Sequence, residues 1–280
     1  MKKSKLVVPM DNINRLKKIA TDLRIDALKM TSKAGSSHIG SMYSIADIIA
    51  VLFFEVLEIP VENVSIEEKD YFILSKGHAG GIVLAALSRL GFFSRSNLEQ
   101  YCQNGSMLSG HISHHINGVD FSTGSLGHGL PVAAGIAYGL KLQKSNKQVF
   151  VLMSDGELNE GSNWEAIMFA AHHQLSNLKV VLDKNNLQSL KSTKETLDLG
   201  ELQNKFREFG WTAQSVDGHC VGSLLNSFLS KEKTYAPSCF IAKTTKGKGV
   251  SFMENSVLWH YRSAKGNEFD AALKELEDQK

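Results

Sequence analysis

Apolar residues recur along the chain with two different periods, and these predict alternating helices and strands. Residues 12–32 place apolar side chains at three- and four-residue steps, and residues 44–57, 79–90 and 127–142 are further stretches of helical character. From residue 149 onward, short continuous apolar runs alternate with helical segments. We predict strands at 71–74, 149–153, 178–182, 212–216 and 239–242, with helices at 162–174, 202–209 and 222–229.

This alternation is typical of an α/β fold in which a doubly wound, mostly parallel sheet carries helices on both faces. No internal repeat, low-complexity stretch or Pro/Ser-rich linker is visible in the sequence. Residues 11–280 are therefore expected to form a single domain, preceded by a flexible tail at residues 1–10. In such folds, ligands bind beyond the carboxyl ends of the strands, where the following loops converge.

Charge and composition argue against several classes of protein. The chain has 280 residues, with 31 Lys plus Arg against 29 Asp plus Glu, so its formal net charge is +2. A nucleic-acid partner is not expected, because nonspecific affinity for phosphates needs many uncompensated basic residues. The longest apolar run, residues 48–54, is too short to cross a membrane. The three widely spaced cysteines match neither a zinc site nor a redox pair, which favours the cytoplasm.

Oxygen-bearing side chains follow two of the predicted strands. Asp155 and Gly156 come directly after one strand, and Asn185 follows the next, 30 residues later. This spacing is the length of one strand, helix and strand, so Asp155 and Asn185 are expected side by side at one edge of the sheet. Mg²⁺ prefers oxygen ligands and shares them with phosphates. Either fragment alone could be an ordinary turn after a strand, but the pair favours a site for a metal and a diphosphate.

Ten histidines accompany 23 glycines, and four of the histidines directly follow a glycine, where a side chain on a tight loop can reach a ligand. These four are His78, His111, His128 and His219. A neutral imidazole exchanges a proton near pH 7 and forms hydrogen bonds with hydroxyl groups. A structural or simply exposed role is the preferred interpretation for four others, namely His114, His115, His172 and His173.

The pairing of residues 154–156 with Asn185 resembles the thiamin diphosphate motif, GDG followed some 30 residues later by N, with Ser154 in place of the first glycine. Further segments look like transketolase in the same order along the chain: 37–40, 74–79, 110–111, 122–129, 155–164, 216–219, 244–255 and 259–260. The match covers nearly the whole chain. It resembles the separately encoded amino-terminal subunits of split bacterial transketolases.

The resemblance implies the diphosphate-binding (PP-type) domain of a thiamin diphosphate enzyme, with Mg²⁺ as the metal and Ca²⁺ or Mn²⁺ able to replace it. The implied metal ligands are Asp155, Asn185 and the carbonyl of Leu187. The implied cofactor-binding residues are His78, Gly124, Leu126, Asp155, Gly156, Asn185 and His219. The implied catalytic residues are His38, His111, His219 and Glu160. In the family, the equivalent of Glu160 lies near the subunit interface and links two active sites by proton transfer. A helix amino-terminal carboxylate is the alternative interpretation of Glu160.

The implied reaction transfers a two-carbon ketol unit from a ketose or ketose phosphate donor to an aldose acceptor. The glutamate that activates the cofactor in this family belongs to a pyrimidine-binding domain, for which this chain leaves no room. That domain is expected on a separately encoded partner in an α₂β₂ assembly, and this chain is expected to be inactive alone. The alternatives are the α subunit of a 2-oxo-acid dehydrogenase E1, a deoxyxylulose-phosphate-synthase-like enzyme, and a non-catalytic regulatory subunit. The histidines favour a sugar over an oxo acid.

The sequence departs from the family pattern at several positions. His128 stands where most transketolases have Gln, Ser37, Ile39 and Ser41 alter the usual SGHPGG segment, and Cys220 replaces a common Asp. We therefore expect the metal site to be retained and the substrate contacts to differ. Residues 243–249 carry lysines and glycines but lack the spacing of a phosphate-binding Walker loop.

Overall fold

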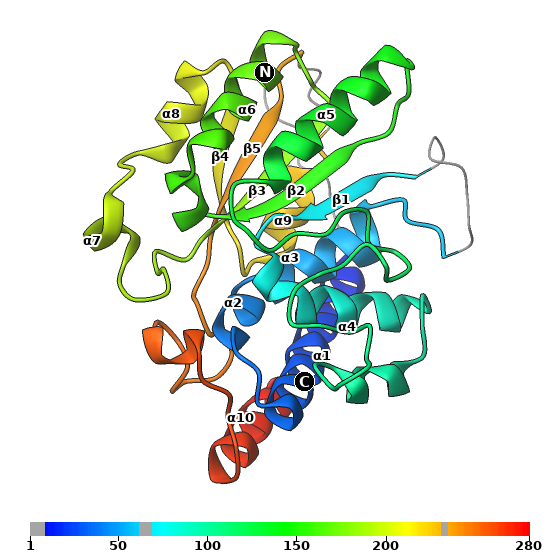
Figure 1. Ribbon diagram of the computed structural model, residues 1–280, viewed down its shortest axis with the longest axis vertical. Helices are drawn as coiled ribbons and strands as arrows, with labels where there is room; N and C mark the ends of the chain where they lie inside the picture. The colour runs from blue at the N-terminus through cyan, green and yellow to red at the C-terminus, as the bar shows by residue number, and fades with distance from the viewer. Residues whose placement is uncertain (1–8, 62–68, 231–234) are drawn as a thin grey trace.

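A five-stranded parallel sheet forms the centre of the protein (Figure 1). The computed structural model describes residues 9–61, 69–230 and 235–280. The sheet order is β1-β2-β3-β5-β4, and every neighbouring pair is parallel. The strands are β1 (Tyr71–Leu74), β2 (Val149–Ser154), β3 (Leu178–Lys184), β4 (Thr212–Asp217) and β5 (Ser238–Lys243). All five predicted strands are present, each within about two residues of its predicted ends.

Helices cover both faces of the sheet, which confirms the predicted fold class (Figure 1). One face carries α5 (Gly129–Leu142), α6 (Gly161–His172) and α8 (Leu202–Glu208). The helices of the other layer are α1 (Met10–Ala34), α2 (Ile39–Ser44), α3 (Ala46–Val51), α4 (Gly80–Leu90), α9 (Val221–Phe228) and α10 (Asn267–Glu277). α10 packs along α1, far from the sheet.

Alternation along each strand divides the interior into two cores. In β1, Phe72 and Leu74 pack with the layer that contains α1, whereas Tyr71 and Ile73 pack with the layer that contains α5. The same alternation continues in β2, β3 and β5, because successive side chains of a strand point to opposite faces. β1, β2, β3 and β5 are mostly buried on both faces, and this explains why they appear in the sequence as continuous apolar runs rather than alternating ones. The edge strand β4 is exposed at four of its six positions.

The strand order brings the loops of interest together. β5 lies between β3 and β4. After β3 the chain therefore forms β4 at the edge of the sheet and then places β5 between these two strands. At the carboxyl edge Ser154 is paired with Asp183, and Lys184 with Lys243. The loops that follow β2, β3 and β5 therefore begin side by side, as a doubly wound fold requires of a ligand site.

The predicted helix at 44–57 is wrong in detail. The chain forms α2 and α3 with a break at Ile45, and then a π-helical turn, η1 (Leu52–Val56). The break coincides with Ser44, whose hydroxyl donates hydrogen bonds to the Ser41 carbonyl and to Asp183 Oδ2. These contacts lie 3 and 139 residues away in sequence, and hydrophobic periodicity carries no signal for the second.

Short elements complete the described residues. α7 (Thr193–Leu197) was not predicted, although Ser192 and Glu195 form a capping box at its start. The single-turn helices are η3 (Gly77–Ala79), η4 (Arg95–Gln100), η5 (Gly156–Asn159) and η6 (Val257–His260). Most of the predicted tail lies outside the described residues, and α1 begins at Met10. Within the described ranges, no helix combines the length and apolar character needed to span a membrane.

Candidate active site

Asp155 and Asn185 meet at the carboxyl edge of the sheet, where the sequence places them. Asp155 is only 3% exposed, and its carboxylate accepts hydrogen bonds from the backbone N–H of Gly156 (2.9 Å) and of Asn186 (2.8 Å). Asn185 Oδ1 accepts from the Leu187 N–H (3.0 Å). The loop after β3, which carries Asn185 and Leu187, is thus fastened to Asp155 at the end of β2.

A buried ion pair lies beneath these ligands. Lys76, directly before η3, places its Nζ 2.5 Å from Asp183 Oδ2 at the end of β3, and both side chains are at most 1% exposed. Asp183 also accepts hydrogen bonds from Asn185 Nδ2 (2.9 Å) and from the Thr244 hydroxyl. Asn185 donates from its nitrogen to Asp183 and accepts at its oxygen from the Leu187 N–H, so both ends of its amide are fixed. Asp183 therefore orients the amide of a predicted metal ligand.

Histidines from four separate segments form a cluster above this edge. The ring centroid of His38 lies 5.0 Å from that of His78, 6.1 Å from that of His111 and 5.0 Å from that of His260. His38 adopts a left-handed backbone conformation, φ +74°, and its N–H donates to the His260 carbonyl (2.8 Å). A non-glycine residue in this region is strained, and strain of this kind concentrates at functional sites.

Lys246 connects the histidine cluster to the predicted metal ligands. Its Nζ donates to His260 Nδ1 (2.8 Å) and to the Gln188 carbonyl (3.1 Å), and it lies 3.5 Å from the Leu187 carbonyl. An ammonium group can only donate, so Nδ1 of His260 is the acceptor nitrogen. In the neutral ring Nε2 then carries the proton, and His260 presents an N–H donor on its other side.

These groups surround a cavity of about 140 Å³. Its lining combines the end of β2, the loops after β1, β3 and β5, and the end of η6. The lining residues are Ser41, Lys76, His78, Leu126, Ser154, Gly156, Asn185, Leu187, Gln188, Ser189, Lys246 and His260. Gly156 is required here, because a Cβ at this position would lie 2.8 Å from Gln188 Cγ.

The charges of the site fit an anionic ligand. Burial, followed by the charge of Lys76, lowers the pKa of Lys246 to about 8, so it remains largely protonated at pH 7. Burial, followed by the charge of Lys246, lowers the pKa of His260 to about 3. Burial, followed by the charge of His111, lowers the pKa of His38 to about 4. These two histidines are therefore neutral hydrogen-bonding groups beside two ammonium groups.

The surroundings of Asp155 raise its pKa rather than lower it. Burial and, after it, the negative charge of Asp183 raise the pKa of Asp155 to about 6. Burial of a carboxylate of this kind is costly unless a cation lies beside it. The oxygen donor set, the buried carboxylate and the two lysines together fit a diphosphate bound with a divalent cation.

His219 lies apart from the other predicted histidines. Its Nε2 accepts from the Thr245 N–H (2.8 Å), so in the neutral ring Nδ1 carries the proton and donates to Asp47 Oδ2 (2.8 Å). Asp47 also binds the Arg24 guanidinium at 2.5 Å, and the pair is nearly inaccessible to solvent. Both ring nitrogens of His219 are engaged with protein groups, an arrangement that holds the loop after β5 in place.

Gly124, His128 and Glu160 do not line the cavity. Gly124 lies beside His111, and a Cβ on it would be 3.6 Å from the histidine Cδ2. Glu160 is at the start of α6, next to Gly127 and outside the cavity. His128 is exposed, and its Nδ1 lies 3.1 Å from the Leu126 carbonyl. The structure thus gathers His38, His78 and His111, and leaves Glu160 and His219 away from that group.

Sequence reasoning assigned no role to several groups at the site. Lys76, Lys246 and His260 lie in segments that resemble transketolase, but their spacing alone indicates no chemistry for them. Glu157 was also missed, although it is fully buried and accepts hydrogen bonds from the Ser75 hydroxyl and the Gly127 N–H. A charged residue two or three positions after an apolar strand, as at Lys76 and Glu157, was the available signal.

The fold and this site define a class of protein, namely α/β domains that bind a diphosphate cofactor beyond the carboxyl ends of a parallel sheet. The family model described as "Transketolase, thiamine diphosphate binding domain" matches residues 15–277. The chain belongs to the transketolase family. Two predictions are confirmed, namely that the chain is part of a transketolase enzyme and that thiamin diphosphate is its cofactor.

Two relatives match along nearly their whole length. One is a subunit of the apulose-4-phosphate transketolase of Actinobacillus succinogenes, 39% identical over 257 residues, which are 91% of this chain and 93% of that protein. The other is the 6-deoxy-6-sulfo-D-fructose transketolase subunit SqwG of a Clostridium species, 34% identical over 260 residues, with 92% and 94% covered. Human transketolase is 37% identical over 268 residues, but this chain spans only 43% of its length.

Solved structures of transketolases are also similar to this chain. Transketolase from Campylobacter jejuni superposes with a TM-score of 0.88 at 27% sequence identity. The superposition covers 95% of this chain and 43% of that one. The chain thus corresponds to less than half of a full-length transketolase.

Proposed function

We propose that this chain is the diphosphate-binding subunit of a two-chain transketolase, which moves a two-carbon ketol unit from a ketose donor to an aldose acceptor. The observation that carries the proposal is the mixed lining of the cavity. The lining includes Asn185 and Leu187, the lysines Lys76 and Lys246, and the histidines His78 and His260, whose pKa values are lowered by burial. Oxygen ligands and lysines suit a metal diphosphate, and neutral histidines suit the hydroxyl groups of a sugar.

In this proposal Asp155, Asn185 and the Leu187 carbonyl hold Mg²⁺, and Lys76 and Lys246 face the diphosphate. Thiamin diphosphate supplies the carbon nucleophile that ketol transfer requires. The chain itself supplies orientation and charge. Asp183 fixes the Asn185 amide, and the backbone N–H groups that now meet Asp155 hold its carboxylate at the edge of the sheet.

The histidines are assigned to the substrate. His38, His78, His111 and His260 lie within one cluster and come from four segments. With Lys246 fixing its tautomer, His260 offers an N–H from Nε2 to a substrate oxygen. We assign His219 to positioning of the loop after β5 rather than to proton transfer, since both of its nitrogens are occupied.

The names of the two relatives suggest the kind of donor. One name specifies a sugar phosphate and the other a sulfonated sugar, so both names contain an anionic group. We propose that the donor of this chain is likewise a ketose with an anionic terminus. The remaining finer proposals are an α₂β₂ assembly, a role for Glu160 at its interface, and a cytoplasmic location, which agrees with three free cysteines.

The size of the cavity supports the proposed partner subunit. About 140 Å³ is below the roughly 300 to 1,000 Å³ of most small-molecule sites, so it accommodates the diphosphate end and not the whole cofactor. The pyrimidine end needs a second surface, which a separately encoded C-terminal transketolase subunit provides.

Reconstitution tests the proposal. The chain, a C-terminal transketolase subunit, Mg²⁺ and thiamin diphosphate are mixed with ketose phosphates and an aldose acceptor, and ketol transfer is measured. Turnover should need both subunits and both cofactors. Turnover by this chain alone would overturn the two-chain assignment, and decarboxylation of pyruvate in place of ketol transfer would favour the oxo-acid alternative.

A further inference from the structure

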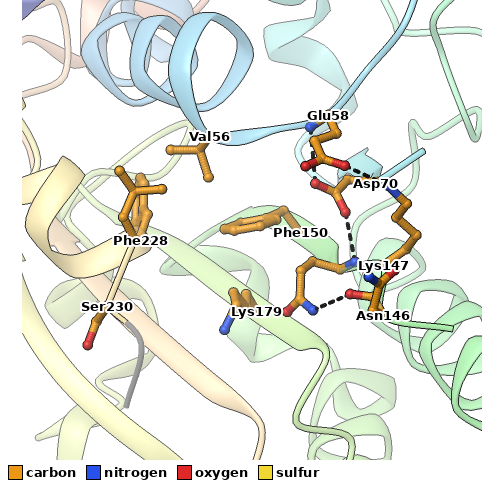
Figure 2. A pocket seen from close by; sticks show the side chains of 11 residues that line it. Val56, Glu58, Asp70, Asn146, Lys147, Phe150, Lys179, Phe228 and Ser230 are labelled. Atoms are coloured by element: carbon orange, nitrogen blue, oxygen red, sulfur yellow. Dashed lines mark hydrogen bonds and ion pairs between the residues drawn. The ribbon is translucent and has the colours of Figure 1, made fainter. Parts of the chain in front are cut away.

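A second cavity, of about 320 Å³, lies at the opposite edge of the sheet, where β1, β2 and β3 begin (Figure 2). Val56, Phe150 and Phe228 form an apolar wall, and Glu58 and Asp70 belong to a polar one. None of its lining residues also lines the candidate active site. The volume is at the lower end of the range for small-molecule sites, which suits a ligand with a single ring rather than a large cofactor.

The acidic groups of the polar wall already have partners within that wall. Asp70 accepts hydrogen bonds from the backbone N–H of Glu58 (3.0 Å) and of Gln148 (2.9 Å). Glu58 forms an ion pair with Lys147 at 2.6 Å. Figure 2 shows these contacts together on one side of the cavity. The carboxylates of both residues therefore already have partners without a ligand.

Lys179 is different. It is the second residue of β3 and is paired in register with Phe150, so its side chain extends from the same face of the sheet. Figure 2 shows it beside Phe150, on the side of the cavity away from Glu58 and Asp70. Within the part of the chain that the structure describes, its ammonium has neither an ion pair nor a hydrogen bond. Burial lowers the pKa of Lys179, with no acidic group to offset the effect.

An ammonium group that is largely removed from water and lacks an acceptor is unfavourable, and an anion placed beside it restores the lost interaction. The neighbouring aromatic rings add a surface for an apolar body. We propose that this cavity binds a small organic monoanion, with its anionic group on Lys179 Nζ and a ring-sized apolar body against Phe150 and Phe228.

Benzoate and benzyl alcohol, a neutral molecule of similar size, are suitable probes for the full-length chain. Their affinities are measured by ligand-observed NMR titration. We expect benzoate to bind with a Kd on the order of 1 mM and benzyl alcohol to bind at least about tenfold more weakly. Lys179→Met should reduce benzoate affinity by at least about tenfold, whereas Lys179→Arg should retain it within about threefold.

Lys205→Gln is the matched control, since Lys205 is an exposed lysine on α8 and lines neither cavity. It should bind benzoate like the wild type. Circular dichroism and urea midpoints establish that each variant is folded, and the Arg variant keeps the test decisive if the Met variant is unstable. Equal binding of both probes, unchanged benzoate affinity in Lys179→Met, or no benzoate binding to the wild type would each overturn the proposal.

Discussion

Asp155 shows at the scale of one residue how function and stability oppose each other. Its side chain is buried beside Asp183, and this environment raises its pKa to about 6. Relative to an ordinary Asp, that shift corresponds to a cost on the order of 3 kcal/mol for keeping the carboxylate ionised at pH 7. A bound divalent cation removes this cost, so the residue is suited to the loaded site and not to the empty one.

We therefore predict that Asp155→Asn is no less stable than the wild type without metal, while its Mg²⁺-dependent binding of thiamin diphosphate is lost. Urea unfolding at pH 7 measures stability, and calorimetric titration in the presence of the partner subunit measures binding. A matched variant, Asp198→Asn, changes an exposed carboxylate and should leave both unchanged. Retained cofactor binding in Asp155→Asn would remove this residue from the metal site.

His260 gives the chain a pH dependence at acidic pH. Its pKa is about 3 in the folded protein and about 6.5 in the unfolded chain, so between these values the unfolded chain takes up a proton that the folded protein does not. Its contribution to the free energy of unfolding is complete above about pH 6.5 and declines as the pH falls. We predict that His260→Gln loses less stability between pH 7 and pH 5 than the wild type does.

Urea unfolding at both pH values measures this difference. His172→Gln, a change at an exposed histidine at the end of α6, is the control and should follow the wild type. Equal losses in His260→Gln and the wild type would show that His260 is not held neutral by its surroundings.

At the scale of elements, one buried ionic chain joins four parts of the fold. Arg24 on α1 binds Asp47 on α3, Asp47 accepts from His219 before α9, and His219 accepts from Thr245 after β5. Burial would raise the pKa of Asp47, but the charge and hydrogen bonds of Arg24 and the hydrogen bond of His219 hold it at about 2. The helical layer thereby supports the loop that carries Lys246.

We predict that Asp47→Ala lowers the free energy of unfolding by about 3 to 5 kcal/mol, because it leaves the Arg24 charge buried without a partner. Glu55→Ala is the control. Glu55 pairs with Arg15 at the surface, where both side chains are about a third to a half exposed, and its loss should cost under about 1 kcal/mol. Equal costs for the two substitutions in urea unfolding would contradict the structural role of the buried chain.

At the scale of the whole molecule, both hydrophobic cores share one sheet. Side chains of β1 to β5 belong alternately to one core and the other, so neither core can be lost without exposing strands of the second. Trp211 packs in the core beside α6, and Trp259 in the core beside α1. The two halves are therefore expected to unfold together.

We predict one cooperative urea transition, with the same midpoint by far-ultraviolet circular dichroism and by tryptophan fluorescence. Trp164 packs against the same core as Trp211, so Trp211→Phe and Trp259→Phe, each made together with Trp164→Phe, leave one tryptophan each and report separately on the two cores. A fluorescence midpoint that differs between these two variants, while their circular dichroism midpoints agree, would show that the cores unfold independently.

Much of the fold could be predicted because local patterns encode it. The strand at 149–153 is a continuous apolar run, and in the structure it is buried on both faces, which is the cause of that pattern. The prediction failed at Ser44, where a contact with Asp183 interrupts an otherwise helical apolar stretch. Periodicity reports which residues prefer burial, but not which distant polar group they will meet.

The candidate site likewise contains some contacts that the sequence predicts and others that it does not. The proximity of Asp155 and Asn185 could be predicted, because each residue comes directly after one of two neighbouring strands. Lys76 and Asp183, in contrast, form an ion pair across 107 residues, and His38 meets His260 through segments at opposite ends of the sequence. Such contacts depend on the order of the strands, and that order is set by packing of the whole chain.

The sequence by itself determined the strands, the helices on both faces, the family resemblance and the meeting of Asp155 with Asn185, because each depends on local spacing. Only the tertiary structure decided that β5 lies between β3 and β4, that His219 is occupied by Asp47 and Thr245, and that Lys179 lines a second cavity. The physical reason is that burial and charge pairing are properties of neighbours in space, which segments distant in sequence provide.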